Sequence, residues 1–185
     1  MLDAARRQFV EFGITGTTIG GIAEAAGVSS QTVYAVFGSK GGLLIALLDQ
    51  LEAEVDSTGY ASAIDAAAGD AGAQLELIVR FHCELFDRGL DVIDLARRSS
   101  SDPVVGGFVD EGNRRRRDAC VRWARSWRKS GVLRGDVTVT TAADLLWVYC
   151  GADLFAAFVL GCGWDRARLE RWLVPTLRSL LLEVS

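Results

Sequence analysis

Residues 17–34 read TTIGGIAEAAGVSSQTVY, and this stretch decides the fold of the N-terminal part of the chain. Thr17 or Thr18 can cap the start of a helix, and Gly27 can end that helix in a tight turn. Ser29 can cap the next helix in the same way. The stretch therefore predicts a helix-turn-helix pair, whose second helix can enter a DNA major groove.

Apolar residues at helical spacing extend this pattern on both sides. A first helix is expected from residue 2 to Gly13, and the recognition-type helix that begins after Ser29 should end at Gly38. A fourth helix is expected over residues 40–55. The side chains that should face inward are Leu2, Ala5, Phe9, Phe12, Ile19, Ile22, Ala23, Ala26, Val33, Phe37, Leu43, Leu44, Leu47, Leu48 and Leu51.

The rest of the chain also favours helices, because it holds only two prolines and no clear strand-like alternation. Residues 57–72 are rich in glycine and alanine and are expected to form a loop that joins two domains. Five helices are expected beyond it, over residues 72–88, 91–99, 103–130, 139–161 and 165–183. The prediction is an all-α fold of about nine helices, with a helix-turn-helix head at residues 1–45 and a helical body at residues 46–185.

Bulk composition predicts a globular protein, since half of the residues are apolar. Four cysteines without a CxxC pair indicate reduced, buried thiols in a cytoplasmic protein: Cys83, Cys120, Cys150 and Cys162. The segment from Ala142 to Trp164 is almost wholly apolar, but Asp144 and Asp153 interrupt it. We expect a helix buried on both sides there and not a membrane span, because a charge at the bilayer centre costs about 2.5–3.5 kcal/mol.

The run at residues 17–29, with the residues that follow it, resembles the DNA-binding head of the tetracycline-repressor (TetR) family. The resemblance covers residues 2–48 and continues through Gln31-Thr32-Val33-Tyr34, Phe37, Ser39-Lys40 and Leu43-Leu44. It implies a homodimer that binds a palindromic operator, in most members a repressor that a small molecule releases from DNA. It assigns DNA contacts to Thr18, Ser30, Gln31, Thr32, Tyr34, Ala35 and Lys40.

The chemistry of these residues suits such contacts. The Gln31 amide can pair bidentately with an adenine edge, and Thr32 can donate to a phosphate or offer its methyl group to thymine. Lys40 at a helix N-terminus is a natural phosphate ligand. The alternative interpretation makes them ordinary solvated polar residues.

Two features depart from the family pattern. The net charge of the chain is −4, and residues 1–45 hold equal numbers of basic and acidic residues, although phosphate neutralisation supplies much of DNA affinity. Four glycines stand inside expected helices, where each costs about 1 kcal/mol relative to alanine. We therefore expect a weakly binding, partly mobile head; these glycines are Gly20, Gly21, Gly41 and Gly42.

Aromatic residues gather in the body, either as plain core or around a largely apolar effector cavity. The candidate ligand-binding residues are His82, Phe86, Trp123, Trp127, Trp147 and Cys150. The last two helices carry an apolar surface that could pair across a two-fold axis, and its candidate interface residues are Phe158, Trp172, Leu173, Leu177 and Leu180. One histidine and scattered cysteines favour neither a metal site nor a cofactor. The arginine run at residues 114–117 sweeps around a helix and is expected to be solvated or paired with Asp110, Glu111 or Asp118.

The leading hypothesis is thus a ligand-responsive transcriptional regulator, most simply a repressor, with double-stranded DNA, a second copy of the chain and an apolar small molecule as partners. One alternative is a dimeric helical protein that has lost DNA binding, which the neutral head favours. A small all-α enzyme is the other, although the chain contains no P-loop, GxGxxG, HExxH or nucleophile-elbow motif.

Overall fold

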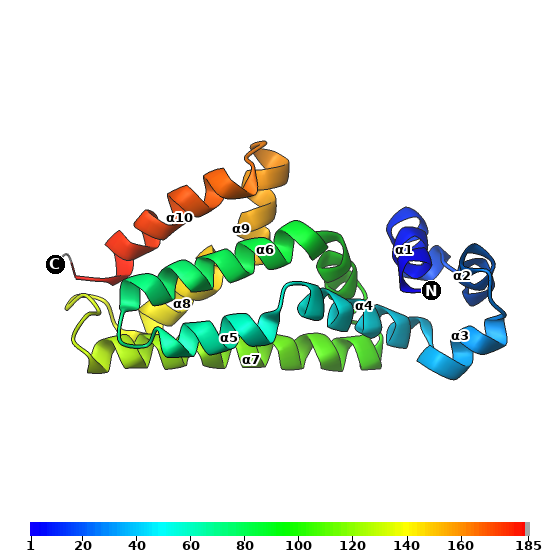
Figure 1. Ribbon diagram of the computed structural model, residues 1–185, viewed down its shortest axis with the longest axis horizontal. Helices are drawn as coiled ribbons and strands as arrows, with labels where there is room; N and C mark the ends of the chain where they lie inside the picture. Colours follow the sequence, from blue (N-terminus) through cyan, green and yellow to red (C-terminus); the bar gives the residue numbers. More distant parts are fainter. Residues whose placement is uncertain (184–185) are drawn as a thin grey trace. The chain divides into compact units, whose positions relative to one another are not determined.

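The computed structural model describes residues 1–183, which fold into ten α-helices and one π-helical turn, with no strand longer than an isolated bridge in that part of the chain (Figure 1). The expected all-α class is therefore confirmed. The elements are α1 Leu2–Gly16, α2 Ile19–Ala26, α3 Ser30–Phe37, α4 Lys40–Glu54, α5 Ser57–Ala66, α6 Ala71–Arg98, α7 Pro103–Lys129, α8 Val139–Tyr149, α9 Ala152–Ala156, η1 Ala157–Gly161 and α10 Arg166–Leu181.

These helices form two compact units. The first unit contains Met1–Ala53 and Gly89–Gly112, and the second contains Glu54–Arg88 and the chain from Asn113 onward. Helices α6 and α7 each contribute residues to both units. The functional division into a head and a body at residue 46 stays a prediction.

Capping side chains set the helices of the first unit, as the sequence predicts. Thr18 Oγ1 accepts a hydrogen bond from the Gly21 amide at 3.0 Å and caps α2. Gly27 ends α2 with φ 65°, ψ 32°, the left-handed conformation that glycine adopts at little cost. Ser29 Oγ then accepts from the Thr32 amide at 3.1 Å and caps α3. The turn between α2 and α3 is thus encoded by three residues.

One hydrophobic core holds the first unit together. Most of the side chains expected to face inward from α1 to α4 are buried in it and pack against buried residues of α6 and α7, but Phe12 is 50% exposed, contrary to expectation. The sequence did not predict the contribution of α6 and α7, because it assigned both helices to the body alone. The buried members are Ala5, Phe9, Ile19, Ile22, Ala23, Val33, Leu43, Leu44, Leu47, Leu48, Val92, Ala96 and Val105.

Two of the four unexpected glycines have a packing role. A Cβ atom at Gly42 would overlap the carbonyl oxygen of Phe37, and one at Gly41 would lie 3.3 Å from Val105 Cγ2. Both positions therefore let α4 approach its neighbours closely, which offsets their cost in helix propensity. The expected mobility of the head stays a prediction.

The chain beyond α4 differs from the expected pattern in two places, at residues 57–66 and 139–161. Residues 57–66 form α5 where a loop was expected; Asp56 caps this helix by accepting from the Gly59 amide at 3.1 Å, and Ile64 is buried. The break expected between residues 88 and 91 is confirmed, because α6 consists of two helices that meet in a kink at Gly89 (φ −141°, ψ 21°). The expected helix at 139–161 is broken after Cys150 into α8, α9 and η1.

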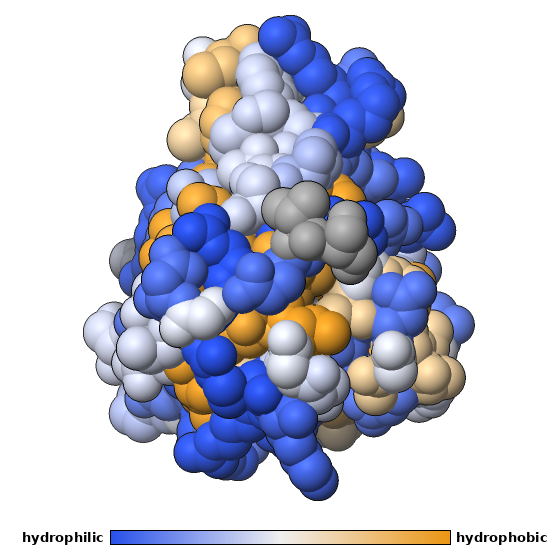
Figure 2. Space-filling model, turned by 90° about the vertical axis from the view of Figure 1, so that its left-hand side faces the viewer, coloured by the Kyte–Doolittle hydropathy of each residue, from blue (hydrophilic) through white to orange (hydrophobic). Residues whose placement is uncertain are grey.

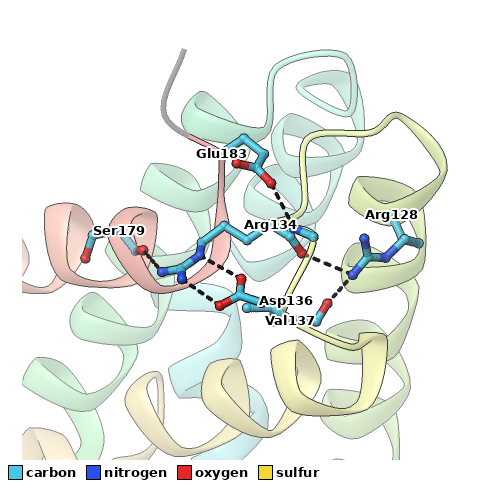
Figure 3. Close-up of polar contacts among 7 residues, drawn as sticks. Arg128, Arg134, Asp136, Val137, Ser179 and Glu183 are labelled. Carbon is cyan, nitrogen blue, oxygen red and sulfur yellow. Dashed lines mark hydrogen bonds and ion pairs between the residues drawn. The ribbon is translucent and has the colours of Figure 1, made fainter.

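Figure 2 shows the surface around the C-terminal end of α10, where hydrophobic residues lie between hydrophilic ones. Hydrogen bonds of Arg134, Asp136, Ser179 and Glu183, which we call the clasp, join the α7–α8 connection to the end of α10 (Figure 3). Arg134 donates to the Ser179 carbonyl oxygen at 2.8 Å and forms two hydrogen bonds with Asp136, at 2.8 and 3.1 Å. The Glu183 carboxylate accepts from the Gly135 amide at 2.8 Å. The clasp satisfies carbonyl groups that the end of a helix leaves unpaired.

Candidate nucleic-acid interface and internal cavity

Helix α3 presents one polar, solvent-exposed face. Val33 is 0% exposed and fixes the rotation of the helix, whereas Tyr34 is 55% exposed. Because neighbouring residues on a helix point in different directions, burial of Val33 turns the predicted contact residues outward. These exposed residues are Ser30, Gln31, Thr32, Tyr34 and Ala35.

An open groove of about 400 Å³ lies beside this face. It brings together Thr18, Tyr34 and Lys40, three of the residues to which the resemblance assigns DNA contacts. Their hydroxyl and ammonium groups are the usual partners of phosphate oxygens. The remaining lining residues are Thr15, Thr17, Ile19, Gly38 and Ser39.

Backbone contacts fix the position of Lys40. Its Nζ donates to the carbonyl oxygens of Ile14 at 2.6 Å and Thr17 at 2.9 Å. Since an ammonium group carries three N–H donors, one is left for a further acceptor in the groove. Thr17 itself is buried, and its hydroxyl, which has one proton to donate, lies 2.9 Å from the Gln8 carbonyl oxygen and 2.7 Å from that of Gly13. Sequence reasoning missed this bracing role of Thr17, for which the adjacent threonine pair was the only signal.

Ion pairing reduces the positive charge of the head further. Arg6 forms a bidentate salt bridge with Asp91, with distances of 2.7 and 2.9 Å. A guanidinium engaged in this way is not a ready phosphate ligand. Of the three basic residues at positions 1–45, Arg7 and Lys40 are the two that remain for electrostatic attraction to DNA.

The second unit contains a small cavity of about 10 Å³. Three of the predicted ligand-binding residues line it, namely His82, Phe86 and Cys150. Drug-sized ligands need about 300–1,000 Å³, whereas this cavity has room for about one water molecule. The other lining residues are Cys83, Tyr149, Gly151, Leu154, Phe155, Leu169 and Leu173.

The three predicted tryptophans do not line this cavity. Trp127 is wholly buried, and its Nε1 donates to Gln74 Oε1 at 2.6 Å. Trp147 lies under the Arg116 guanidinium, with 4.1 Å between the Cζ atom and the ring centroid. Trp123 is half-buried on α7. Core packing thus accounts for Trp127, and a cation–π contact for Trp147.

The cavity wall carries no charge. His82 is 5% exposed, and burial, together with the nearby Arg116, lowers its pKa to about 4. Burial also raises the pKa of the Cys83 thiol to about 12 and that of Cys150 further still. These groups are therefore neutral near pH 7, and the thiols are unreactive. The fourth cysteine, Cys162, is exposed, which corrects the expectation that all four are buried.

A half-buried aromatic cluster lies where η1 meets α10. The ring of Phe158 is 4.5 Å from that of Trp164 and 4.9 Å from that of Trp172, between centroids. Leu160 beside it is 73% exposed, and Val148 on α8 is also exposed. The segment at 142–164 is thus not buried on both sides, contrary to expectation.

This arrangement revises the candidate dimer interface. Leu173 is 2% exposed and Leu177 0% exposed, so both belong to the core of the protomer and cannot meet a partner. They lie one turn apart on the buried side of α10, together with Leu169 and Leu181. Phe158, Trp172 and Leu180 remain at least partly exposed and stay candidates.

Comparisons with known proteins match this geometry. Residues 1–47 match the sequence profile of the bacterial regulatory proteins of the tetR family. The chain is 34% identical over 85 residues to the HTH-type transcriptional regulator TtgR of Pseudomonas putida. The aligned region covers 46% of this chain and 40% of TtgR. It is 29% identical over 173 residues to the HTH-type transcriptional repressor KstR2 of Mycobacterium tuberculosis. This alignment covers 84% of this chain and 83% of KstR2.

Solved structures share the whole fold. The SmeT–triclosan complex superposes with a TM-score of 0.76 at 21% identity, covering 98% of this chain and 90% of SmeT. KstR2 of M. tuberculosis superposes with a TM-score of 0.73 at 20% identity, covering 99% and 93%. FadR of Bacillus subtilis, solved with stearoyl-CoA, gives a TM-score of 0.72 at 17% identity, covering 95% of each chain. The N-terminal residues 1–47, with their capped helix-turn-helix, are thus similar to the bacterial regulatory proteins of the tetR family, and the chain as a whole shares the fold of these solved structures.

Proposed function

We propose that the protein is a ligand-responsive transcriptional repressor that binds a palindromic operator as a homodimer in the cytoplasm. The observation that carries this proposal is the outward polar face of α3 beside the groove that holds Thr18, Tyr34 and Lys40. A recognition helix needs side chains that reach base edges, flanked by groups that hold the phosphates. Relatives named as transcriptional regulators support the same conclusion.

In this proposal, base reading falls to the exposed residues of α3. Gln31 accepts from and donates to an adenine edge, and Thr32 contacts a phosphate or a thymine methyl group. The Thr32 hydroxyl already lies 2.8 Å from Ser29 Oγ, which holds it at the start of the helix. Thr18, Tyr34 and Lys40 hold the phosphates, while Ser30 and Ala35 lie on the same face.

Two copies of α3 are needed to read a palindrome, about 34–36 Å apart across one turn of DNA. The exposed apolar side chains of η1 and α10 supply a surface for pairing, centred on Phe158, Leu160 and Trp172. An effector that prefers a dimer with a different spacing would shift the population away from the DNA-bound state. Solved relatives in complex with triclosan and with stearoyl-CoA support effector binding by the body.

A gel-shift titration with the DNA that flanks the protein's own gene tests this function. The wild type should shift a fragment that contains a palindrome, and Gln31→Ala should weaken binding about 5- to 150-fold per contact, because a bidentate base contact contributes about 1–3 kcal/mol. Asn113→Ala is the matched control, since Asn113 is an exposed neutral side chain on α7. Equal binding by both variants would refute the assignment of Gln31 to a base contact.

A further inference from the structure

The outward side of α3 carries more apolar surface than a helix that only contacts phosphates needs. The helix reads SQTVYAVF and contains no Arg, Lys, His, Asn, Asp or Glu. Val36 is 57% exposed, although it is a large apolar side chain. In the major groove of DNA, the apolar group that such a side chain can contact is the C5-methyl group of thymine.

Helix geometry places these apolar groups on the side that is turned away from the core. Val33 is 0% exposed, and successive residues of a helix are turned by about 100°, so Ala35 lies nearly opposite Val33. Thr32 stands three residues before Ala35 and four before Val36, and all three are exposed. Side chains at these spacings are neighbours on a helix surface. We call the methyl groups of Thr32, Ala35 and Val36 the apolar strip.

The cap of α3 determines which part of Thr32 is available to DNA. Thr32 Oγ1 lies 2.8 Å from Ser29 Oγ, and the Thr32 amide donates to the same Ser29 oxygen at 3.1 Å. The hydroxyl group of Thr32 is therefore engaged in the cap. The Cγ2 methyl group is the part of this exposed side chain that the cap does not use, so it is the part that joins the strip.

Guanine has no matching bidentate partner on this helix. The commonest contact to guanine comes from Arg or Lys, which donate to its O6 and N7 acceptors. Arg6 and Arg7 lie on α1, and Lys40 lies at the start of α4, where backbone carbonyl oxygens hold its ammonium group. The Gln31 amide matches adenine N6 and N7 instead. Because Gln31 stands four residues before Ala35, one A·T pair can meet the amide through adenine and the strip through thymine.

Resting on the proposed function, we propose that α3 reads A·T base pairs, with Gln31 bound to adenine and the apolar strip in contact with thymine C5-methyl groups. The operator half-site is then A·T at the base pairs beneath α3. Residues 1–45 hold equal numbers of basic and acidic residues, so the head gains little from phosphate neutralisation. Burial of methyl groups supplies affinity that does not depend on that charge.

Duplexes that the full-length protein selects from a random-sequence library test this inference with the wild-type chain. In the selected half-site, each thymine is replaced in turn by uracil, which lacks only the C5-methyl group. Each adenine is replaced by 7-deazaadenine, which has a C–H group in place of the N7 acceptor. The matched control is 7-deazaguanine, which makes the same change at guanine.

Fluorescence anisotropy should show about fourfold weaker binding for uracil at a contacted position, which corresponds to the ~0.8 kcal/mol of one buried methylene group. At the adenine that Gln31 contacts, 7-deazaadenine should weaken binding about fivefold through the loss of one hydrogen bond. At positions beneath α3, 7-deazaguanine should leave the affinity unchanged. None of these measurements depends on the folding of a variant.

Two variants then separate the methyl group of Thr32 from its hydroxyl group. Thr32→Ser keeps the hydroxyl group and removes the methyl group, so it should bind uracil and thymine duplexes equally at one position. Thr32→Val keeps the methyl group and removes the hydroxyl group, so it should retain the preference for thymine. Gln31→Ala should lose the response to 7-deazaadenine and keep the response to uracil.

The outcomes distinguish this inference from the function on which it rests. A selected half-site with G·C pairs beneath α3, equal binding of all uracil and thymine duplexes, or weaker binding on 7-deazaguanine substitution there would overturn the inference and leave operator binding intact. Loss of the thymine preference in Thr32→Val but not in Thr32→Ser would also overturn it. Failure to select any duplex at low salt would overturn the proposed function itself.

Discussion

Truncation of a leucine to alanine should have different effects on the buried side and on the partly exposed side of α10. Leu177 is 0% exposed inside the protomer, whereas Leu180, on the same helix, is half-buried. Truncation of a fully buried leucine to alanine removes its transfer free energy and leaves a cavity, at a cost of about 2–5 kcal/mol. For a chain of this size, that loss lowers Tm by about 4–20 °C. Leu177→Ala should therefore destabilise the protomer itself.

Leu180→Ala is the matched control, because it makes the same change on the outer side of the helix. We expect a smaller loss of protomer stability and a larger rise in the dimer dissociation constant. Thermal unfolding at two protein concentrations measures the first quantity, and sedimentation velocity over a dilution series measures the second. The reasoning would be refuted if Leu177→Ala dissociated the dimer at an unchanged Tm while Leu180→Ala left the dissociation constant unaltered.

Three further predictions follow from charges and polar contacts. In a plot of the logarithm of the operator-binding constant against the logarithm of the salt concentration, we expect a slope no steeper than about −4, because each head supplies only Arg7 and Lys40 and each neutralised phosphate contributes about −0.9. A slope near about −10 in a filter-binding titration would contradict this expectation. Arg134→Ala should speed amide hydrogen exchange at Gly135 and Glu183, because it removes the side chain that forms hydrogen bonds with Ser179 and Asp136. Unchanged exchange rates would show that these contacts do not stabilise the α7–α8 connection. The free energy of unfolding should decrease by about 3 kcal/mol as pH falls from about 6.5 to about 4, because His82 takes up a proton in the unfolded chain but not in the folded chain. In urea unfolding over this pH range, the His82→Phe variant should not show this decrease.

Local signals made the helix-turn-helix predictable. Thr18, Gly27 and Ser29 act through the backbone within a few residues, so their roles follow from residue type alone. Burial of Val33 follows from helical spacing, and it determines which side chains of α3 face outward. The sequence was sufficient here because each determinant is local.

Elements that depend on tertiary contacts were not predictable in this way. The residues of α5 have weak amphipathic patterning, and the helix is anchored by Ile64 in the core and capped by Asp56. The break of α6 at Gly89 lies where the sequence separates two helices, but the contact with Leu51, which a side chain at this position would overlap, could not be predicted. Leu173 and Leu177 look like interface residues in the sequence, because periodicity gives an apolar face but does not say which neighbour covers it.

The central claim is that two copies of α3 read one palindrome on the same face of DNA. Hydroxyl-radical footprinting of the full-length protein on its promoter fragment tests this claim most directly. We predict two symmetric protected patches whose centres are about one turn apart, ~10 base pairs, both lost in Gln31→Ala and both kept in Asn113→Ala. A single protected patch, or no protection at low salt from a protein that is dimeric in solution, would contradict it.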